Sequence, residues 1–308
     1  MKKLVLSVVA ACAVSAAAPA LAADMAVKAV KAPVVAAPSP WDIAFGSAIM
    51  NDYMWRGYTQ SAHRPSVAAY FEPRYNITDT LQLYAGMSAE SIKFPNKASA
   101  EVDFYGGIRP TVGPVAFDIG FWYYYYPGGD STYIQNGAIT PAFKNASFYE
   151  VYGKATWTVN DLIALGGNIN YTPSYLGTGA WGTYYSGTAK FTAPGTWFPN
   201  GIGAYLSGEV GRQELGTTDV LSVDGFAPVA ATKLPSYTTW NVGVGFTWKV
   251  FTVDLRYSDT NLSRSDCALL TGDPGASPTG AGGALESRWC GATFIAKLSA
   301  DLTLGALK

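Results

Sequence analysis

Charged side chains are scarce in this sequence. Asp, Glu, Lys and Arg together make up 14% of the 308 residues, against roughly 25% in an ordinary soluble domain. The formal net charge of −1 is close to neutral for this length. Neither a nucleic-acid partner nor a polybasic membrane patch is therefore indicated.

Histidine is nearly absent, since His63 in the segment 61–65 (SAHRP) is the only one. A hydrolytic barrel needs a nucleophile and a general base, and that base is usually His. Ser61 and Ser66 lie nearby in sequence, but a solvated turn residue is the simpler interpretation of His63. The Gly-rich segment 272–283 lacks the spaced carboxylates of a calcium loop and the Gly-Lys-Ser/Thr of a phosphate loop. We therefore expect no enzyme activity, no cofactor and no metal site.

Long apolar runs are missing after the first 23 residues, where no segment approaches the roughly 18 residues of a membrane helix. At the start, two lysines precede an apolar stretch that ends in A-L-A at residues 20–22, the pattern of an exported protein's signal peptide. A lipoprotein signal ending at Cys12 is the weaker alternative, because few residues separate it from the lysines. We expect a signal peptide over 1–23, an Ala/Pro-rich flexible periplasmic linker over 24–40 and a folded domain over 41–308.

Aromatic residues, in contrast, reach 14% of the chain, and apolar and polar residues alternate with a period of two. Near residue 242, for example, Trp240, Val242 and Val244 alternate with Thr239 and Asn241. Successive side chains of a strand point to opposite faces, so each such segment predicts a strand with one apolar and one polar face. The pattern predicts strands over 41–60, 65–75, 81–91, 101–111, 115–126, 147–159, 162–171, 181–192, 202–211, 236–248, 251–258 and 288–304.

A soluble β-sandwich would also alternate, but two features favour a membrane barrel. Trp240 and Trp248 lie eight residues apart, about 26 Å along a strand, which approaches the spacing of the aromatic girdles around a lipid-facing band. Short connections also alternate with long ones rich in Gly, Pro, Ser and Asp. The exceptions are the connection 193–201, long for a periplasmic turn, and the connection between the first two predicted strands, short for an outer loop. We therefore predict an all-β fold: a transmembrane antiparallel up-and-down β-barrel of about 12 strands in a bacterial outer membrane.

The same alternation predicts which charged residues face the lumen. Both signs are present in similar number, so strong ion selectivity is not indicated, because selective channels carry rings of one sign. A water-filled channel and a lumen plugged by salt bridges both fit this mixture. The predicted pore-lining residues are Asp52, Arg56, Glu72, Arg74, Glu101, Asp103, Arg109, Asp118, Glu150, Lys154, Lys190, Glu209, Asp254 and Arg256.

The stretch NDYMWRGYTQ, residues 51–60, places two of these charges among large aromatic residues. If the first strand continues through Gln60, Tyr53 and Trp55 face lipid in the outer girdle, while Asp52 and Arg56 face the lumen. These two charges are four residues apart, roughly 13 Å along a strand, so they cannot pair with each other. The nearest candidate partners in sequence are Glu72 and Arg74 of the next strand.

The stretch also carries a resemblance. Asp52, Tyr53, Arg56, Gly57, Thr59, Gln60 and Pro65 match the Asp-Tyr-x-x-Arg-Gly-x-(Ser/Thr)-Gln pattern, followed by Pro, that opens bacterial putative porins of the TorF type. The chain resembles that family over about thirty residues, with looser agreement of strand rhythm to the C-terminus. The resemblance implies an outer-membrane barrel described as a porin.

These observations lead to a hypothesis of function. We expect a porin through which small hydrophilic solutes diffuse along a polar lumen. The alternative is a closed structural or adhesive barrel that acts through its extracellular loops. Outer-membrane lipid and the barrel-assembly machinery are the expected partners, an oligomer is compatible with the sequence, and no nucleic acid is expected.

The cysteines give a separate prediction. Cys12 leaves with the signal peptide, so the mature chain retains Cys267 and Cys290, an even pair in an oxidising compartment. A bridge between them would close a loop of about two dozen residues, worth roughly 3 kcal/mol in the chain-entropy model. We predict this disulfide; two free thiols are the alternative.

Overall fold

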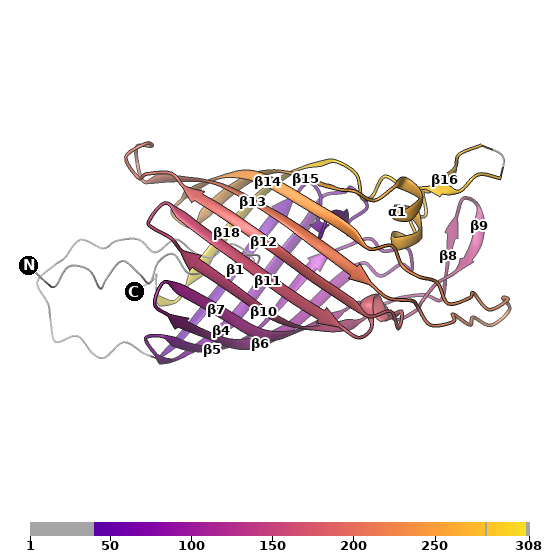
Figure 1. Cartoon of the computed structure of the whole chain (residues 1–308), viewed down its shortest axis with the longest axis horizontal. Coiled ribbons are helices and arrows are strands. Elements are labelled where there is room, and N and C mark those ends of the chain that lie inside the picture. The colour runs from indigo at the N-terminus through magenta and orange to yellow at the C-terminus, as the bar shows by residue number, and fades with distance from the viewer. Residues whose placement is uncertain (1–39, 281, 306–308) are drawn as a thin grey trace, which may run out of the picture.

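Twelve strands pair edge to edge into one closed barrel, and every neighbouring pair is antiparallel (Figure 1). This computed structural model describes residues 40–280 and 282–305. The predicted signal peptide lies outside the described residues, as does the predicted linker apart from Pro40. The strand order is sequential around the wall, and the last strand closes the barrel against the first. The predicted transmembrane up-and-down barrel is confirmed.

The barrel strands match the predicted segments closely, with larger differences only at the first and last. β1 ends ten residues before the predicted end, and the closing strand begins at Thr293 rather than at residue 288. The twelve are β1 (Trp41–Met50), β4 (Ser66–Thr78), β5 (Leu81–Ser91), β6 (Ala100–Val112), β7 (Val115–Tyr125), β10 (Phe148–Thr158), β11 (Ile163–Thr172), β12 (Gly182–Thr192), β13 (Ile202–Leu215), β14 (Tyr237–Trp248), β15 (Phe251–Thr260) and β18 (Thr293–Thr303).

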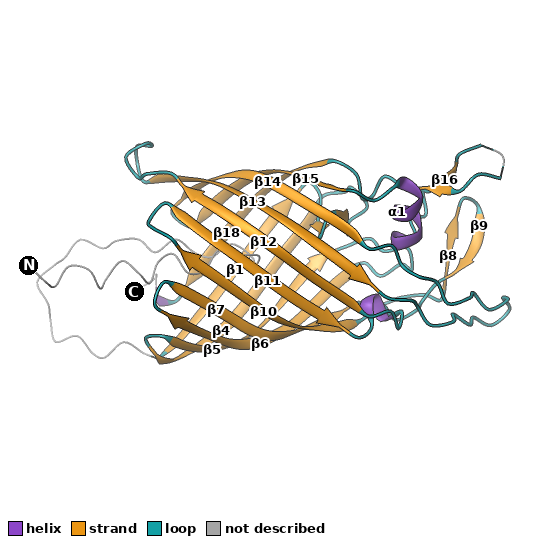
Figure 2. Cartoon of the chain, in the orientation of Figure 1, coloured by secondary structure: helices purple, strands orange, loops and turns teal. Residues whose placement is uncertain are grey.

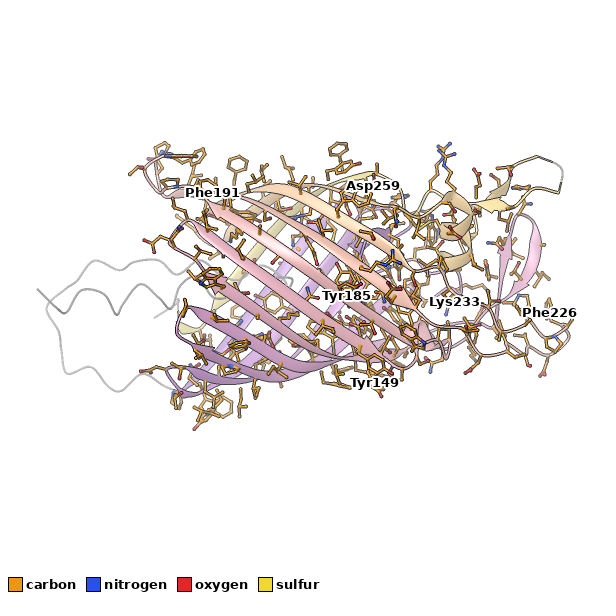
Figure 3. All side chains as sticks on the ribbon, viewed as in Figure 1. Tyr149, Tyr185, Phe191, Phe226, Lys233 and Asp259 are labelled. Atoms are coloured by element: carbon orange, nitrogen blue, oxygen red, sulfur yellow. A yellow bond between two sulfur atoms is a disulfide. The ribbon has the colours of Figure 1, made fainter. Side chains whose placement is uncertain are left out.

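The period-two pattern separates the two faces of the wall. Along β14, Val242, Val244 and Phe246 are exposed apolar side chains on the outside, whereas Thr239 is buried inside. On the outer face of β12, Tyr185 lies toward the long loops and Phe191 toward the other end (Figure 3). The outside is thus an apolar band with aromatic side chains toward both ends, as lipid contact requires.

Tyrosine rings cover glycines on the inner face. The Gly245 position has no room for a Cβ, which would meet the ring of Tyr205 on the neighbouring strand at 2.0 Å. Each ring therefore lies against the backbone of the next strand, where a larger residue would clash. Five such pairs are Gly46–Tyr70, Gly86–Tyr105, Gly120–Tyr152, Gly211–Tyr184 and Gly245–Tyr205.

The two ends of the barrel differ (Figure 2). At the end where β1 begins and β18 stops, the strands are joined by short turns, except for the longer connection 193–201. The opposite end carries the long loops. These contain the hairpins β8–β9 (Thr132–Gln135, Ala138–Pro141) and β16–β17 (Ser277–Pro278, Leu285–Glu286), the 3₁₀ turn η2 (Tyr175–Gly177) and the helix α1 (Arg264–Thr271). In the described ranges, no helix combines the length and apolarity that crossing a membrane would need.

The predicted disulfide is present. Cys267 in α1 is bonded to Cys290, which precedes β18, and both residues are almost fully buried. Ser263 caps the helix by accepting a hydrogen bond from the Asp266 N–H, and the helix ends at Gly272 in the left-handed conformation. The bridge therefore fixes a short helix, which would be marginal alone, to the barrel rim.

We expect the double variant Cys267→Ser/Cys290→Ser to lose about 3 kcal/mol of stability, because the 23-residue separation sets the loop-closure entropy. The loss is measured by urea unfolding of the refolded protein in lipid. Unreduced wild-type protein, denatured before treatment with a thiol reagent, should take up no label. Labelling at both cysteines would contradict the assignment.

Candidate functional site

Residues 51–65, here called the infolded segment, leave the wall after β1 and enter the outer end of the lumen. They contain the hairpin of β2 (Met54–Trp55) and β3 (Tyr58–Thr59), which is separate from the barrel sheet. The hairpin turns at Arg56 and Gly57, both with positive φ (46° and 88°). A strand cannot continue through two such residues. The prediction that the first strand runs to Gln60 is therefore wrong.

The aromatic residues of the infolded segment face inward. Trp55 packs against Tyr175, Tyr124 and Phe148, with ring centroids 5.9, 5.9 and 6.3 Å apart. Tyr53 donates its hydroxyl hydrogen to Glu101 at 2.8 Å. The prediction that Tyr53 and Trp55 lie in the lipid-facing girdle is wrong. Inside the barrel, Trp55 packs on aromatic rings and Tyr53 finds a carboxylate acceptor.

Arg56 reaches the opposite wall of the barrel. Its guanidinium donates two hydrogen bonds of 2.7 Å to the carboxylate of Glu150 and a third, of 3.1 Å, to Gln213. The group lies between the rings of Trp55 and Tyr184, 4.3 and 4.4 Å from their centroids. The predicted partners on the neighbouring strand, Glu72 and Arg74, are not used. A bidentate, stacked arginine is a strong anchor when both charges are dry, and here the ion-paired side chains are 8% and 1% exposed.

Asp52 holds the base of the infolded segment. It accepts hydrogen bonds from Thr59 at 2.5 Å and from Ser61 at 3.0 Å, and it contacts His63 Nδ1 at 2.6 Å. The Nε2 of His63 faces the Arg288 carbonyl oxygen at 3.2 Å. Neither ring nitrogen is directed at a serine, so this arrangement does not form a Ser-His catalytic pair. His63 is also more than the solvated turn residue that the sequence indicated.

The histidine contacts predict a pH dependence of the infolded segment. Both acceptors are oxygens, so only the doubly protonated imidazolium can donate to both. The hydrogen bond to Asp52 raises the pKa of His63, with burial opposing. Because the folded pKa lies above the unfolded one, the stabilisation is complete below about pH 6.5 and is lost as the pH rises through the raised pKa. We expect amide hydrogen exchange in 54–60 to accelerate over that interval.

The matched variant for this measurement is His63→Gln, which cannot titrate. Its amide exchange rates in 54–60 should rise with pH only as the intrinsic hydroxide dependence of exchange requires, with no additional step. An equal step in both proteins would show that another group is responsible.

Deeper in the lumen, charged residues bond to one another, both within a strand and between strands. Arg109 joins Glu72 at 2.8 Å and Asp118 at 3.3 Å, and Arg74 joins Glu72 at 2.6 Å. On the other side, Arg256 bonds Asp254 at 3.0 Å. These contacts place the side chains inside the barrel, where most are buried or half-buried. Arg109 links β4, β6 and β7, whereas the other two pairs each lie within one strand, β4 or β15.

Tyrosine hydroxyls complete this network. Tyr84, Tyr184 and Tyr205 donate to Asp118, Glu209 and Asp254 at 2.5, 2.9 and 2.7 Å. Lys154 and Lys190 lie over the rings of Tyr152 and Tyr205, 4.5 and 4.6 Å from their centroids. The tyrosines were not among the predicted lumen residues, although Tyr84 and Tyr152 share their parity along the strands and could have been identified by it.

Three carboxylates gather where the infolded segment meets β5 and β6. Oxygens of Glu90, Glu101 and Asp103 lie within 4.8 Å of one another, and none of them takes part in a salt bridge of the described residues. Hard divalent cations prefer such oxygens. Tyr53 donates a hydrogen bond to Glu101, and Ser88 donates one to Asp103. Two of the three carboxylates are therefore hydrogen-bonded to hydroxyl groups of the protein itself.

The sequence profile of one bacterial family matches residues 35–277, most of the chain. The chain belongs to this family, Gcw_chp, described as a bacterial protein of unknown function. For this Gcw_chp protein the description names no TorF-type porin, so the finer resemblance stays a prediction. No curated protein matches the chain.

Several solved structures are similar to this Gcw_chp chain. The COG4313 outer membrane channel from Pseudomonas putida F1 is 10% identical, with 90% of this chain and 100% of that chain covered and a TM-score of 0.46. The NanC porin is 10% identical, with 85% and 100% covered and a TM-score of 0.43. A deletion mutant of the monoaromatic hydrocarbon channel TodX is 9% identical, with 87% and 90% covered and a TM-score of 0.48.

Proposed function

We propose that this protein is an outer-membrane channel for small hydrophilic solutes, and that the conformation described here is its closed state. The observation that carries the proposal is the infolded segment: it fills the outer end of a polar lumen without belonging to the wall. Inside the lumen it is held by side chains, above all Arg56 with Glu150. Backbone hydrogen bonds also join Asn51, Thr59 and Gln60 to neighbouring segments, outside the strand pairs of the barrel. Contacts of that kind can open while every strand pair of the barrel remains intact.

The wall supports the same function. A closed sheet satisfies its backbone hydrogen bonds internally, and an apolar outer face with a polar inner face fits an outer-membrane site. Solutes would pass the paired charges of both signs, which favour polar molecules without selecting one ionic sign. The protein's partners would then be membrane lipid, the assembly machinery and the solutes themselves. The proposal involves no catalysed reaction.

One observation favours the second candidate, a closed structural or adhesive barrel. Inside the wall, Ser47, Tyr70, Glu90, Lys297 and Asp301 line a space of about 30 Å³, enough for about two water molecules. If comparable gaps are all that remains along the axis once the infolded segment leaves, solutes do not pass. The function would then reside in the long loops.

The experiment that separates these candidates is planar-bilayer conductance of the refolded chain and of a variant without the infolded segment. Met50 and Ser66 are direct cross-strand partners, so residues 51–65 can be replaced by a four-residue turn containing Asn-Gly. We expect low or brief conductance from the wild type and large, sustained steps from the variant.

A matched control shortens the hairpin β8–β9, which also stands in the outer loops, and should leave conductance unchanged. If neither the wild type nor the variant without the infolded segment conducts, although both are folded, the closed structural barrel is the correct reading. Equal, large conductance in both would show that the segment is no constriction.

A further inference from the structure

A second cavity lies among the outer loops, above the infolded segment. It has a volume of about 300 Å³, within the range of small-molecule sites. Tyr58 and Thr59 of β3 form its floor, and Tyr175 stands beside them. Its other lining residues come from seven stretches, at 94–96, Tyr133, 141–146, 176–178, 218–234, 269–272 and Trp289. The cavity is therefore built from segments far apart in sequence and is separate from the charged lumen below.

The lining is mainly apolar, with Phe94, Pro95, Phe143, Leu234 and Leu270 among its residues. The hydroxyls of its threonines are already hydrogen-bonded within the protein. Four donate, Thr59 to Asp52, Thr178 to the Tyr175 carbonyl, Thr271 to the Cys267 carbonyl and Thr232 to the Ala230 carbonyl, and that of Thr218 accepts from the Thr232 N–H. Asn96 donates to the carbonyls of Phe143 and Lys144.

Charge is almost absent from this lining. Among its residues there is no Lys, Arg or His, and its one carboxylate, Asp219, is exposed. A charged ligand entering the cavity would lose water without gaining a counter-ion, which is costly. The cavity thus selects against ions and strongly polar solutes, the opposite preference to that of the lumen.

The hydroxyl of Tyr133 is an available hydrogen-bond donor in this lining. Tyr133 of β8 is 9% exposed, and its hydroxyl makes no hydrogen bond with any residue in the described part of the chain. Burial raises the pKa of Tyr133 to about 12, so the hydroxyl keeps its proton at physiological pH and can donate it.

The walls are held in place before any ligand arrives. The Cys267–Cys290 disulfide joins the helix that carries Leu269 and Leu270 to the residue next to Trp289. The floor is fixed by the 2.7 Å hydrogen bond between the hydroxyls of Tyr58 and Tyr175. A pre-organised pocket avoids the entropy cost of ordering loops on binding.

We propose that this cavity binds one uncharged, mainly apolar molecule of about two fused rings, carrying an oxygen that accepts a hydrogen bond from Tyr133. The size follows from volume, since an apolar cavity of about 150 Å³ holds benzene. This site goes beyond the proposed channel and does not depend on it, because its ligand rests on the infolded segment and does not traverse the lumen.

The test uses the full chain refolded into lipid nanodiscs and titrated calorimetrically, with empty nanodiscs subtracted. The probe is 2-naphthol, and naphthalene-2-sulfonate is its charged counterpart. We expect saturable binding of one 2-naphthol per protein and no saturable binding of the sulfonate. Tyr133→Phe should weaken 2-naphthol binding by about threefold to tenfold, the value of one net hydrogen bond.

Two neighbouring substitutions give a matched pair. Leu221 lines the cavity, whereas Val220 beside it does not and is 57% exposed. Leu221→Arg should reduce affinity at least about tenfold, because it buries a charge in the apolar pocket. Val220→Arg should leave it unchanged. Absence of saturable 2-naphthol binding, equal binding of the sulfonate, or undiminished binding by a folded Leu221→Arg protein would each overturn the proposal.

Discussion

Arg56→Met is expected to release the infolded segment from the wall and to raise conductance. The substitution leaves the Glu150 carboxylate buried without its partner, and breaking a buried pair on one side costs about 3–5 kcal/mol. The side chains of this pair are 8% and 1% exposed, so solvent cannot replace the lost contact. Faster amide exchange at Tyr58 and Thr59, together with longer open events in planar bilayers, would record the release.

Two further variants identify the cause. Arg212→Met removes an ion pair with Glu214 whose side chains are 34% and 35% exposed, and solvent-exposed pairs contribute about 0–1 kcal/mol. It should therefore leave exchange and conductance close to wild type. Arg56→Met/Glu150→Leu removes both charges and should recover most of the lost stability, since apolar replacement of a buried pair is often neutral. Equal exchange in Arg56→Met and wild type would mean that the pair does not hold the segment.

Val244→Arg is expected to abolish membrane insertion in most molecules. Val244 lies mid-strand on the outer face of β14 and is 41% exposed, where lipid would surround it. Arginine near the bilayer midplane on the lipid face of a barrel costs about 2–4 kcal/mol. Folding yield into lipid vesicles, measured by the heat-dependent shift of the folded band on gels, reports the loss.

The same chemical change outside the membrane serves as the control. Val220 is 57% exposed and lies in an outer loop, between β13 and β14. Val220→Arg should fold with wild-type yield. Comparable yields for the two variants would show that the outward face of β14 does not meet lipid at Val244.

Strand number and the two faces of the wall could be derived from the sequence because they rest on local pattern, and the disulfide because only two cysteines follow residue 23. Thr239 lies at an odd-numbered position of β14 and faces inward, whereas Val242 and Val244 lie at even-numbered positions and face outward. This alternation of faces holds along any barrel strand. The same rule selected the pore-lining residues, whose role stays a prediction, and it wrongly placed Asp52 and Arg56 on the first strand. The connection 193–201, long for its end of the barrel, was visible as an exception in the sequence and is present in the fold.

The infolded segment could not be derived in this way, because its partners are remote. Arg56 bonds to Glu150, 94 positions away in the chain, and no local pattern identifies that pairing. Alternation appeared to continue through residues 51–60, since a short hairpin alternates like a strand. The available signal was Gly57 following Arg56, which allows a tight reversal and would have placed Trp55 inside.

The tyrosine–glycine pairs on the inner wall have a mechanical consequence. Each ring lies against the next strand's backbone where a Cβ would clash. Four of the hydroxyls in these pairs, those of Tyr70, Tyr152, Tyr184 and Tyr205, donate hydrogen bonds to carboxylates on other strands. Such a side chain cannot rotate toward the barrel axis without losing its contact with the glycine backbone and its hydrogen bond to the carboxylate. The inner diameter of the barrel is therefore fixed. With a rigid bore and one removable obstruction, single-molecule current traces would show two discrete levels and no graded intermediate values.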